Sequence, residues 1–331
     1  MKKLTIIILI SLFCFKSKLY AQFKNSINSE GSNKIQYTVD RNDPESVRKL
    51  NFEIFPASLY IGPWAGLSFN ICAAVAYDLA PRLSLFCNGA VGYSNTFLNQ
   101  HYDLTIPLKP YEEGNAAAAF YFINKSLTGP QAIPVASLSN GNYTTTYFFR
   151  VPIKHIIKLG IEGGLNYTNS IIGGYGPSFG GYNINDPSQK KYNFQTLSSD
   201  INFSAFATFI GLDLTLIQDY LVSYKDPDYP MPEHKDRSNK FKVYFDFLLP
   251  TNGTYSNTTY VSSYSSIPNG VYNLNKYTNN NSSGLRLGVN FNSLRTFGFS
   301  FGSEVGITPG VVGGPIYVRF NVGMALNSAP R

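Results

Sequence analysis

The feature that most constrains the fold is an alternation of apolar and polar residues with a period of two, which recurs along most of the chain. In the run 316–325, IYVRFNVGMA, the even positions are apolar, whereas the odd positions carry Tyr, Arg, Asn, Gly and Ala. Successive side chains of a β-strand point to opposite faces, so each such run predicts a strand with one apolar face. We count ten runs, at residues 51–61, 66–79, 82–93, 143–153, 156–168, 201–217, 240–249, 284–292, 296–306 and 315–325.

The connections between these runs also alternate in length. Short turns are predicted at 80–81, 154–155 and 293–294, whereas the long segments 94–142, 169–200 and 250–283 fall on the opposite side. Tight turns at one rim and long loops at the other are typical of transmembrane β-barrels. We therefore predict an antiparallel up-and-down barrel of about ten strands, with eight to twelve allowed, over residues 51–326.

One connection departs from this layout. The charged segment 218–240 is long but falls on the side of the short turns. It is either a genuine excursion on that side or a region that hides two uncounted strands. As an excursion it is a candidate binding region for a periplasmic partner.

Composition bears on what the apolar faces touch. Charged residues make up 14% of the chain and aromatic residues 15%, whereas soluble domains have roughly 25% charged residues. The polar faces are mostly Gly, Ser, Asn and Ala, which suits a crowded interior better than a water-exposed surface. We therefore predict that the apolar faces contact outer-membrane lipid. A secreted soluble β-sandwich that binds glycans through its loops is the alternative from another class.

The N-terminus predicts export. Lys2 and Lys3 precede the mostly apolar stretch 4–15, and Ala21 offers a small residue at a cleavage site, so residues 1–21 read as a signal peptide. Its removal takes away four lysines and no acids, which lowers the formal charge from +7 to +3 (7 − 4). We therefore expect no nucleic-acid partner. Residues 22–50 are expected to be a flexible periplasmic segment and residues 327–331 a C-terminal tail.

Single charges of both signs lie on the polar faces of the predicted strands. They are the acids Asp78, Glu162, Asp213, Asp246 and Glu304 and the bases Arg150, Lys158, Lys242, Arg286 and Arg319. A selective pore carries rings of charge of one sign, whereas balanced charges favour a network of pairs that fills a narrow barrel. We predict such a filled interior, in which Glu304 bridges Arg286 or Arg319; a small passive diffusion channel is the alternative.

Aromatic and cysteine positions give two further predictions. Tyr60, Tyr77, Tyr93, Tyr143 and Tyr167 fall near strand ends, where amphipathic rings form the aromatic girdles of membrane barrels. Cys72 and Cys87 lie on neighbouring runs, with Cys72 on the polar face and Cys87 on the apolar face. Since their sulfurs point to opposite sides, we expect no disulfide between them.

Catalytic chemistry finds little support in the sequence. The three histidines, His101, His155 and His234, all fall in predicted loops or turns, and no spacing typical of a metal site or an activated nucleophile occurs. The Gly-rich stretch 171–181 is interpreted as a surface loop, and 110–124 as a short helix at the rim or a partial plug. We predict no enzyme activity and no cofactor, with a surface ligand or glycan at the long loops, which are rich in Tyr, Asn and Ser.

The signal peptide, the ten-residue alternating runs, the strand–turn–strand YDLAPRLSLF at 77–86 and the terminal run IYVRFNVGMAL resemble the small outer-membrane β-barrel proteins of Bacteroidetes-type Gram-negative bacteria. The chain departs from their commonest ending, because it stops at Ala329, Pro330 and Arg331 rather than on an aromatic residue. The resemblance implies a location in the outer membrane and a structural, assembly or surface-binding role, and it implies no particular activity.

Overall fold

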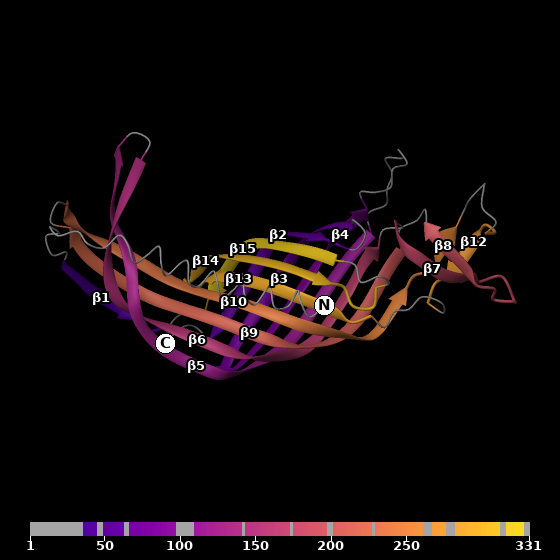
Figure 1. Ribbon diagram of the computed structural model, residues 1–331, viewed down its shortest axis with the longest axis horizontal. Helices are drawn as coiled ribbons and strands as arrows, with labels where there is room; N and C mark the ends of the chain where they lie inside the picture. The colour runs from indigo at the N-terminus through magenta and orange to yellow at the C-terminus, as the bar shows by residue number, and fades with distance from the viewer. Residues whose placement is uncertain are drawn as a thin grey trace, which may run out of the picture.

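The computed structural model of this chain describes residues 36–44, 49–62, 66–96, 109–140, 143–172, 175–196, 201–226, 229–260, 267–275, 282–311 and 316–327. These residues form fifteen β-strands and no helix (Figure 1). The predicted signal peptide and the predicted tail beyond Asn327 lie outside the described residues, as does His101.

Ten of the strands close into an antiparallel barrel. They are β2 (Leu50–Ile61), β3 (Gly66–Ala80), β4 (Leu83–Thr96), β5 (Lys109–Asn140), β6 (Tyr143–Ile172), β9 (Ile201–Asp226), β10 (Tyr229–Tyr255), β13 (Gly284–Ser293), β14 (Phe297–Ile307) and β15 (Ile316–Asn327). Neighbours in this order pair with each other, and a seam between β15 and β2 closes the ring. The predicted closed all-β barrel is therefore confirmed.

The two rims of the barrel differ as the connection lengths predict. The turn rim carries the tight turns between β3 and β4 and between β13 and β14. The loop rim carries the long connections, and a separate four-stranded sheet lies within them: β7 (Tyr175–Asn183), β8 (Tyr192–Thr196), β11 (Thr258–Tyr260) and β12 (Gly270–Asn273). In Figure 1 the loop rim is at the right and the turn rim at the left.

The strand count agrees with the prediction, but two assignments within it are wrong. Strand β5 occupies most of the predicted loop 94–142, including the predicted helix 110–124. Its stretch Asn115–Ala119 is almost all alanine, which gives little apolar contrast between the two faces. Strand β6 runs unbroken through the turn predicted at 154–155. Buried positions change from odd to even between Ile153 and Ile156. In the sequence, this change of the buried face has the same pattern as a turn between two strands.

The charged segment 218–240 is a genuine excursion and hides no barrel strand. Strands β9 and β10 continue past the turn rim as a paired hairpin. Strand β1 (Gln36–Asn42) adds to the edge of β9, opposite residues 220–225. The segment 22–50 therefore includes strand β1, and its flexibility stays a prediction; residues 22–35 lie outside the described part.

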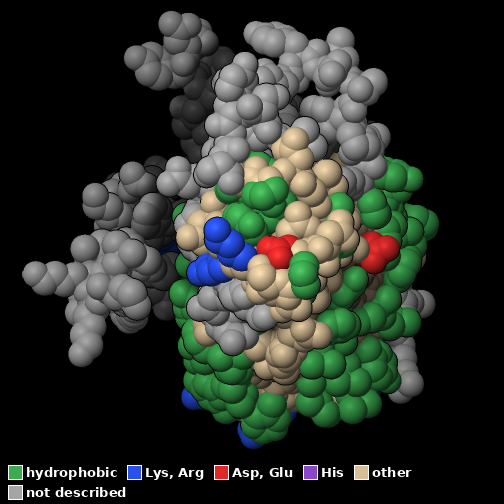
Figure 2. All heavy atoms as spheres, turned by 90° about the vertical axis from the view of Figure 1, so that its right-hand side faces the viewer, with side chains coloured by type: hydrophobic (Ala, Val, Ile, Leu, Met, Phe, Trp, Pro, Cys, Tyr) green, Lys and Arg blue, Asp and Glu red, His purple; other side chains and the backbone are tan. Residues whose placement is uncertain are grey.

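The apolar face of the barrel strands is the outer face. Phe69, Ile210 and Phe299 are 67, 57 and 52% exposed, and Figure 2 shows apolar side chains along the flank of the barrel below the loop rim. A β-sandwich would enclose these side chains between two sheets, so the sandwich alternative does not fit the closed barrel. Among the described residues, no helix is long and apolar enough to cross a membrane.

Beyond the turn rim, part of the β5–β6 hairpin folds back onto the outer face of β9. We call the described residues 129–140 and 143–153 of this hairpin the clasp. Its side chains pack against the face of β9 that points outward in the barrel, and the contact buries six apolar or aromatic residues to 5% exposure or less: Ile133, Val151, Ile153, Tyr220, Val222 and Tyr224. The chain thus has a small conventional core outside the barrel.

Candidate functional site

The barrel interior gathers most of the charges predicted for it. Nine of the ten predicted side chains lie on its inner face, namely Asp78, Lys158, Glu162, Asp213, Lys242, Asp246, Arg286, Glu304 and Arg319. The exception is Arg150, which is exposed on the clasp, because that part of β6 has left the barrel. Glu53 and Glu113, which were not predicted, are also buried inside.

The first interior group centres on Lys242 of β10. Its ammonium lies 2.6 Å from the Glu162 carboxylate and 2.8 Å from Asp213. Asp213 is fully buried and also accepts hydrogen bonds from the hydroxyls of Tyr121 (3.0 Å) and Thr215 (2.7 Å). Each charged group therefore has at least one partner, which a buried charge requires to be tolerated.

The second group is a cross-strand pair between β10 and β13. Asp246 and Arg286 stand directly opposite each other, and Arg286 Nε lies 2.5 Å from the carboxylate. Arg286 also donates to the Asn115 side chain at 2.9 Å. Gly211 is the neighbour of Asp246 on β9, where a Cβ would come within 1.9 Å of Asp246 Oδ1. Glycine at this position makes room for the carboxylate.

The third group joins β14, β15 and β5. Arg319 and Glu304 are direct cross-strand partners, 3.7 Å apart, and Arg319 also pairs with Glu113. Glu304 accepts a hydrogen bond from Tyr317 at 2.7 Å and another from Tyr244. The prediction that Glu304 bridges at least one arginine is confirmed for Arg319; the structure shows no ion pair from Glu304 to Arg286.

Buried apolar and aromatic clusters flank this polar interior. At the turn rim, Ile156, Ile217 and Leu294 form a buried cluster. Toward the loop rim, the ring of Tyr60 packs on those of Tyr111 and Tyr317, with centroids 5.1 and 5.5 Å apart. The charge groups therefore lie between two buried clusters.

The assignment of Tyr60 to an outer aromatic girdle is wrong, since it is 3% exposed in the interior. A bulge in β2 between Phe55 and Ser58 shifts the alternation and turns Tyr60 inward. Tyr77 and Tyr93 are 39 and 62% exposed on the outer face. Tyr167 also points outward, where its ring contacts Phe206, and the side chain of Tyr143 lies outside the described part.

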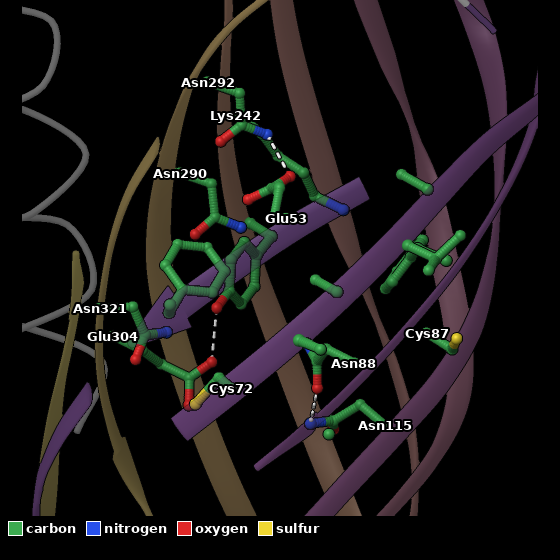
Figure 3. A pocket seen from close by; sticks show the side chains of 18 of the residues that line it. Glu53, Cys72, Cys87, Asn88, Asn115, Lys242, Asn290, Asn292, Glu304 and Asn321 are labelled. Atoms are coloured by element: carbon green, nitrogen blue, oxygen red, sulfur yellow. Dashed lines mark hydrogen bonds between the residues drawn. The ribbon is translucent and has the colours of Figure 1, made fainter. Parts of the chain in front are cut away.

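A small cavity remains beside the charge groups. It measures about 130 Å³ and lies between β3 and β4 on one side and β10, β13 and β14 on the other. Figure 3 shows Cys72, Asn88, Asn290, Glu304 and Asn321 around it. Sites for small molecules usually measure about 300–1,000 Å³, so this cavity is small for a ligand and suits water. Cys72 is buried, Cys87 is exposed and both are free, as predicted.

Acids outnumber bases in the described interior. With Glu53 and Glu113 added there are seven carboxylates, and with Lys240, which also lines the cavity, there are five cations, an excess of two acids (7 − 5). The predicted balance of five and five was wrong because β5 was taken for a loop and the weak strand β2 was given no interior charge. The charges form mixed pairs rather than rings of one sign.

The described residues hold one serine–histidine contact, between Ser223 and His234 Nδ1 at 2.7 Å. It is exposed beyond the turn rim, and the nearby Asp40 bonds to the serine rather than to the histidine. In a hydrolase triad the carboxylate orients the histidine, so this contact lacks the geometry of a triad. No cluster of three potential metal ligands occurs among the residues that the structure describes.

Comparison with models of known protein families and with curated proteins gives no match for this chain.

Proposed function

We propose that this protein is an integral outer-membrane β-barrel with a structural, assembly or surface-binding role and a closed interior. The observation that carries the proposal is the apolar outer face of a closed barrel, because such a surface is covered favourably by lipid. Monomeric soluble proteins rarely expose contiguous apolar patches larger than a few hundred Å². Ile71, Ile210, Phe299 and Phe320, from four different strands, are each more than 40% exposed here.

The filled interior favours a structural or binding role over a passive channel. Three paired charge groups lie between the Tyr60 cluster and the Ile156 cluster, and the cavity beside them is about 130 Å³. A ten-stranded barrel leaves little lumen once side chains are in place. The passive-channel alternative requires an open path past these clusters and charge groups.

The loop rim supports a surface-binding role. The sheet of β7, β8, β11 and β12 packs on an aromatic cluster that includes Phe194, Tyr255 and Tyr272, with Tyr192 and Tyr260 partly buried against it. Phe194, Tyr255 and Tyr272 are buried, so Tyr192 and Tyr260 are the rings of this cluster that a ligand could contact. Tyrosine offers a large and rigid contact area with a polar tip. A surface ligand or glycan would bind this sheet and the segments that flank it. Of the predicted loop 94–142, residues 97–108 and 141–142 lie outside the described part.

The membrane location is tested by cell fractionation of the full chain. We expect recovery with the outer membrane, retention after an alkaline wash and release by detergent. Recovery in the soluble periplasmic or culture fraction without detergent contradicts the proposal.

A further inference from the structure

A groove at the turn rim lies outside the barrel interior. It measures about 580 Å³ and is bounded by the clasp (Ile133, Pro134), the β10 extension and the β13–β14 turn. Its volume is within the range of about 300–1,000 Å³ of small-molecule sites, unlike that of the interior cavity. The elements that bound it lie at the left-hand end of Figure 1, where the β5–β6 hairpin rises.

The charge of the groove is positive. Lys235, Arg237 and Arg295 line it, and Asp236 is the acid among its described lining residues. Asp236 is already paired with Arg41 and, at 3.5 Å, with Arg295. Lys235 has no ion-pair partner among the described residues. The groove therefore has a net positive charge that an anionic ligand could neutralise.

The groove also borders the apolar belt. Phe297 and Phe299 line it, are 72 and 52% exposed, and belong to the outer face of β14. On β10, Arg237 shares the outer face with Phe241, four residues away. Four residues of strand span about 13 Å. Along β10, Arg237 therefore lies about 13 Å beyond Phe241 on the turn side of the belt, whereas Phe297 and Phe299 reach the groove itself.

We propose that this groove binds the headgroup of an anionic phospholipid. The phosphate contacts Lys235 and Arg237, and the acyl chains lie along Phe297 and Phe299. Charge complementarity supports this occupant, since a phosphodiester is the anion found next to an apolar belt at a membrane surface. The inference rests on the proposed membrane location, and it adds a lipid site on the turn side of the bilayer.

The test is native mass spectrometry of the full chain in detergent micelles that contain phosphatidylglycerol or phosphatidylcholine. We expect the parent to retain phosphatidylglycerol preferentially. In the double variant Lys235→Gln and Arg237→Gln, this preference should fall by about tenfold. The matched control is Lys125→Gln with Lys225→Gln, which removes the same charge from exposed positions outside the groove and should keep the preference.

Four outcomes overturn the proposal. The first three are equal retention of both lipids by the parent, an unchanged preference in the groove variant and equal loss in the control variant. Displacement of phosphatidylglycerol by excess inorganic phosphate also overturns it, because the site would then take free phosphate. Heat-modifiable migration on a gel verifies that each variant is folded. If fractionation recovers the chain without membranes, the proposed function fails; if a membrane-embedded, folded chain shows no lipid preference, the groove proposal fails alone.

Discussion

One face of β9 has two different environments along its length. Within the barrel, Leu212 and Leu214 point outward and are 53 and 37% exposed, whereas beyond the turn rim Tyr220 and Val222 continue the same face at 5 and 0%. The alternation of inward and outward side chains is the same in both regions. The difference is that the clasp covers this face beyond the turn rim and not within the barrel. Among the described residues, the chain covers this face only where β9 has left the barrel, which fits the proposal that lipid covers the rest.

The largest expected effect concerns the barrel interior, where charges take the place of an apolar core. Arg286→Met leaves Asp246 buried without its cation, which should lower the free energy of unfolding by about 3–5 kcal/mol. Urea unfolding in detergent measures this change. The double variant with Asp246→Asn should recover most of the loss. A single variant as stable as the parent would show that the pair is not needed for folding.

A second test compares the two faces of β15. Phe320 points outward and Asn321 inward, where Asn321 accepts a hydrogen bond from Ser58 at 2.7 Å. Phe320→Arg should cost about 2–4 kcal/mol near the centre of a bilayer. Asn321→Arg should cost less, since the interior has excess acids and a cavity beside Asn321. Heat-resistant migration after refolding into lipid measures both, and equal damage at the two positions contradicts the lipid-facing assignment.

A third test uses the two environments of β9 directly. Val222→Ala removes buried methyl groups and should cost about 2 kcal/mol of local stability beneath the clasp. Leu212→Ala on the same face within the barrel should cost about 0.5 kcal/mol. Hydrogen exchange of residues 218–225 and of the barrel strands separates the two effects. If Val222→Ala leaves exchange unchanged, the clasp is not the cover that the structure indicates.

The smallest expected effect is a dependence on pH at the junction of clasp and barrel. Burial lowers the pKa of His155 below its ordinary value of 6.5, and the Arg237 charge adds to this. The unfolded chain then binds the proton more readily than the folded chain, so the contribution is present above pH 6.5 and is lost as the pH falls below it. Hydrogen exchange near Gln218, which contacts His155, should quicken below pH 6.5. His155→Gln should remove this pH dependence. If the pH dependence persists in that variant, another group causes it.

The sequence predicts the barrel because alternation within a strand is a local signal. Val318, Phe320 and Val322 share a face whatever lies around them, and the charges between them fall inside for the same reason. Local signals fail at Tyr60, because a bulge turns its side chain from the outer to the inner face. They also fail at Glu113, because the neighbouring run of alanines shows no alternation from which a strand could be predicted. The clasp also escapes prediction, because its burial depends on residues about 70–90 positions apart in sequence, such as Val151 and Val222.

The seam between β2 and β15 has a consequence for the order of folding. It pairs Asn51 with Asn327 and Ile61 with Val318, so the ring stays open until the last strand has been made. Hairpins such as β3–β4 can form early from neighbouring residues, whereas the seam must close a loop of more than 250 residues. Contacts of such separation slow folding. The rate-limiting step should therefore be ring closure, and until then both strands carry unpaired edges that a chaperone would need to shield.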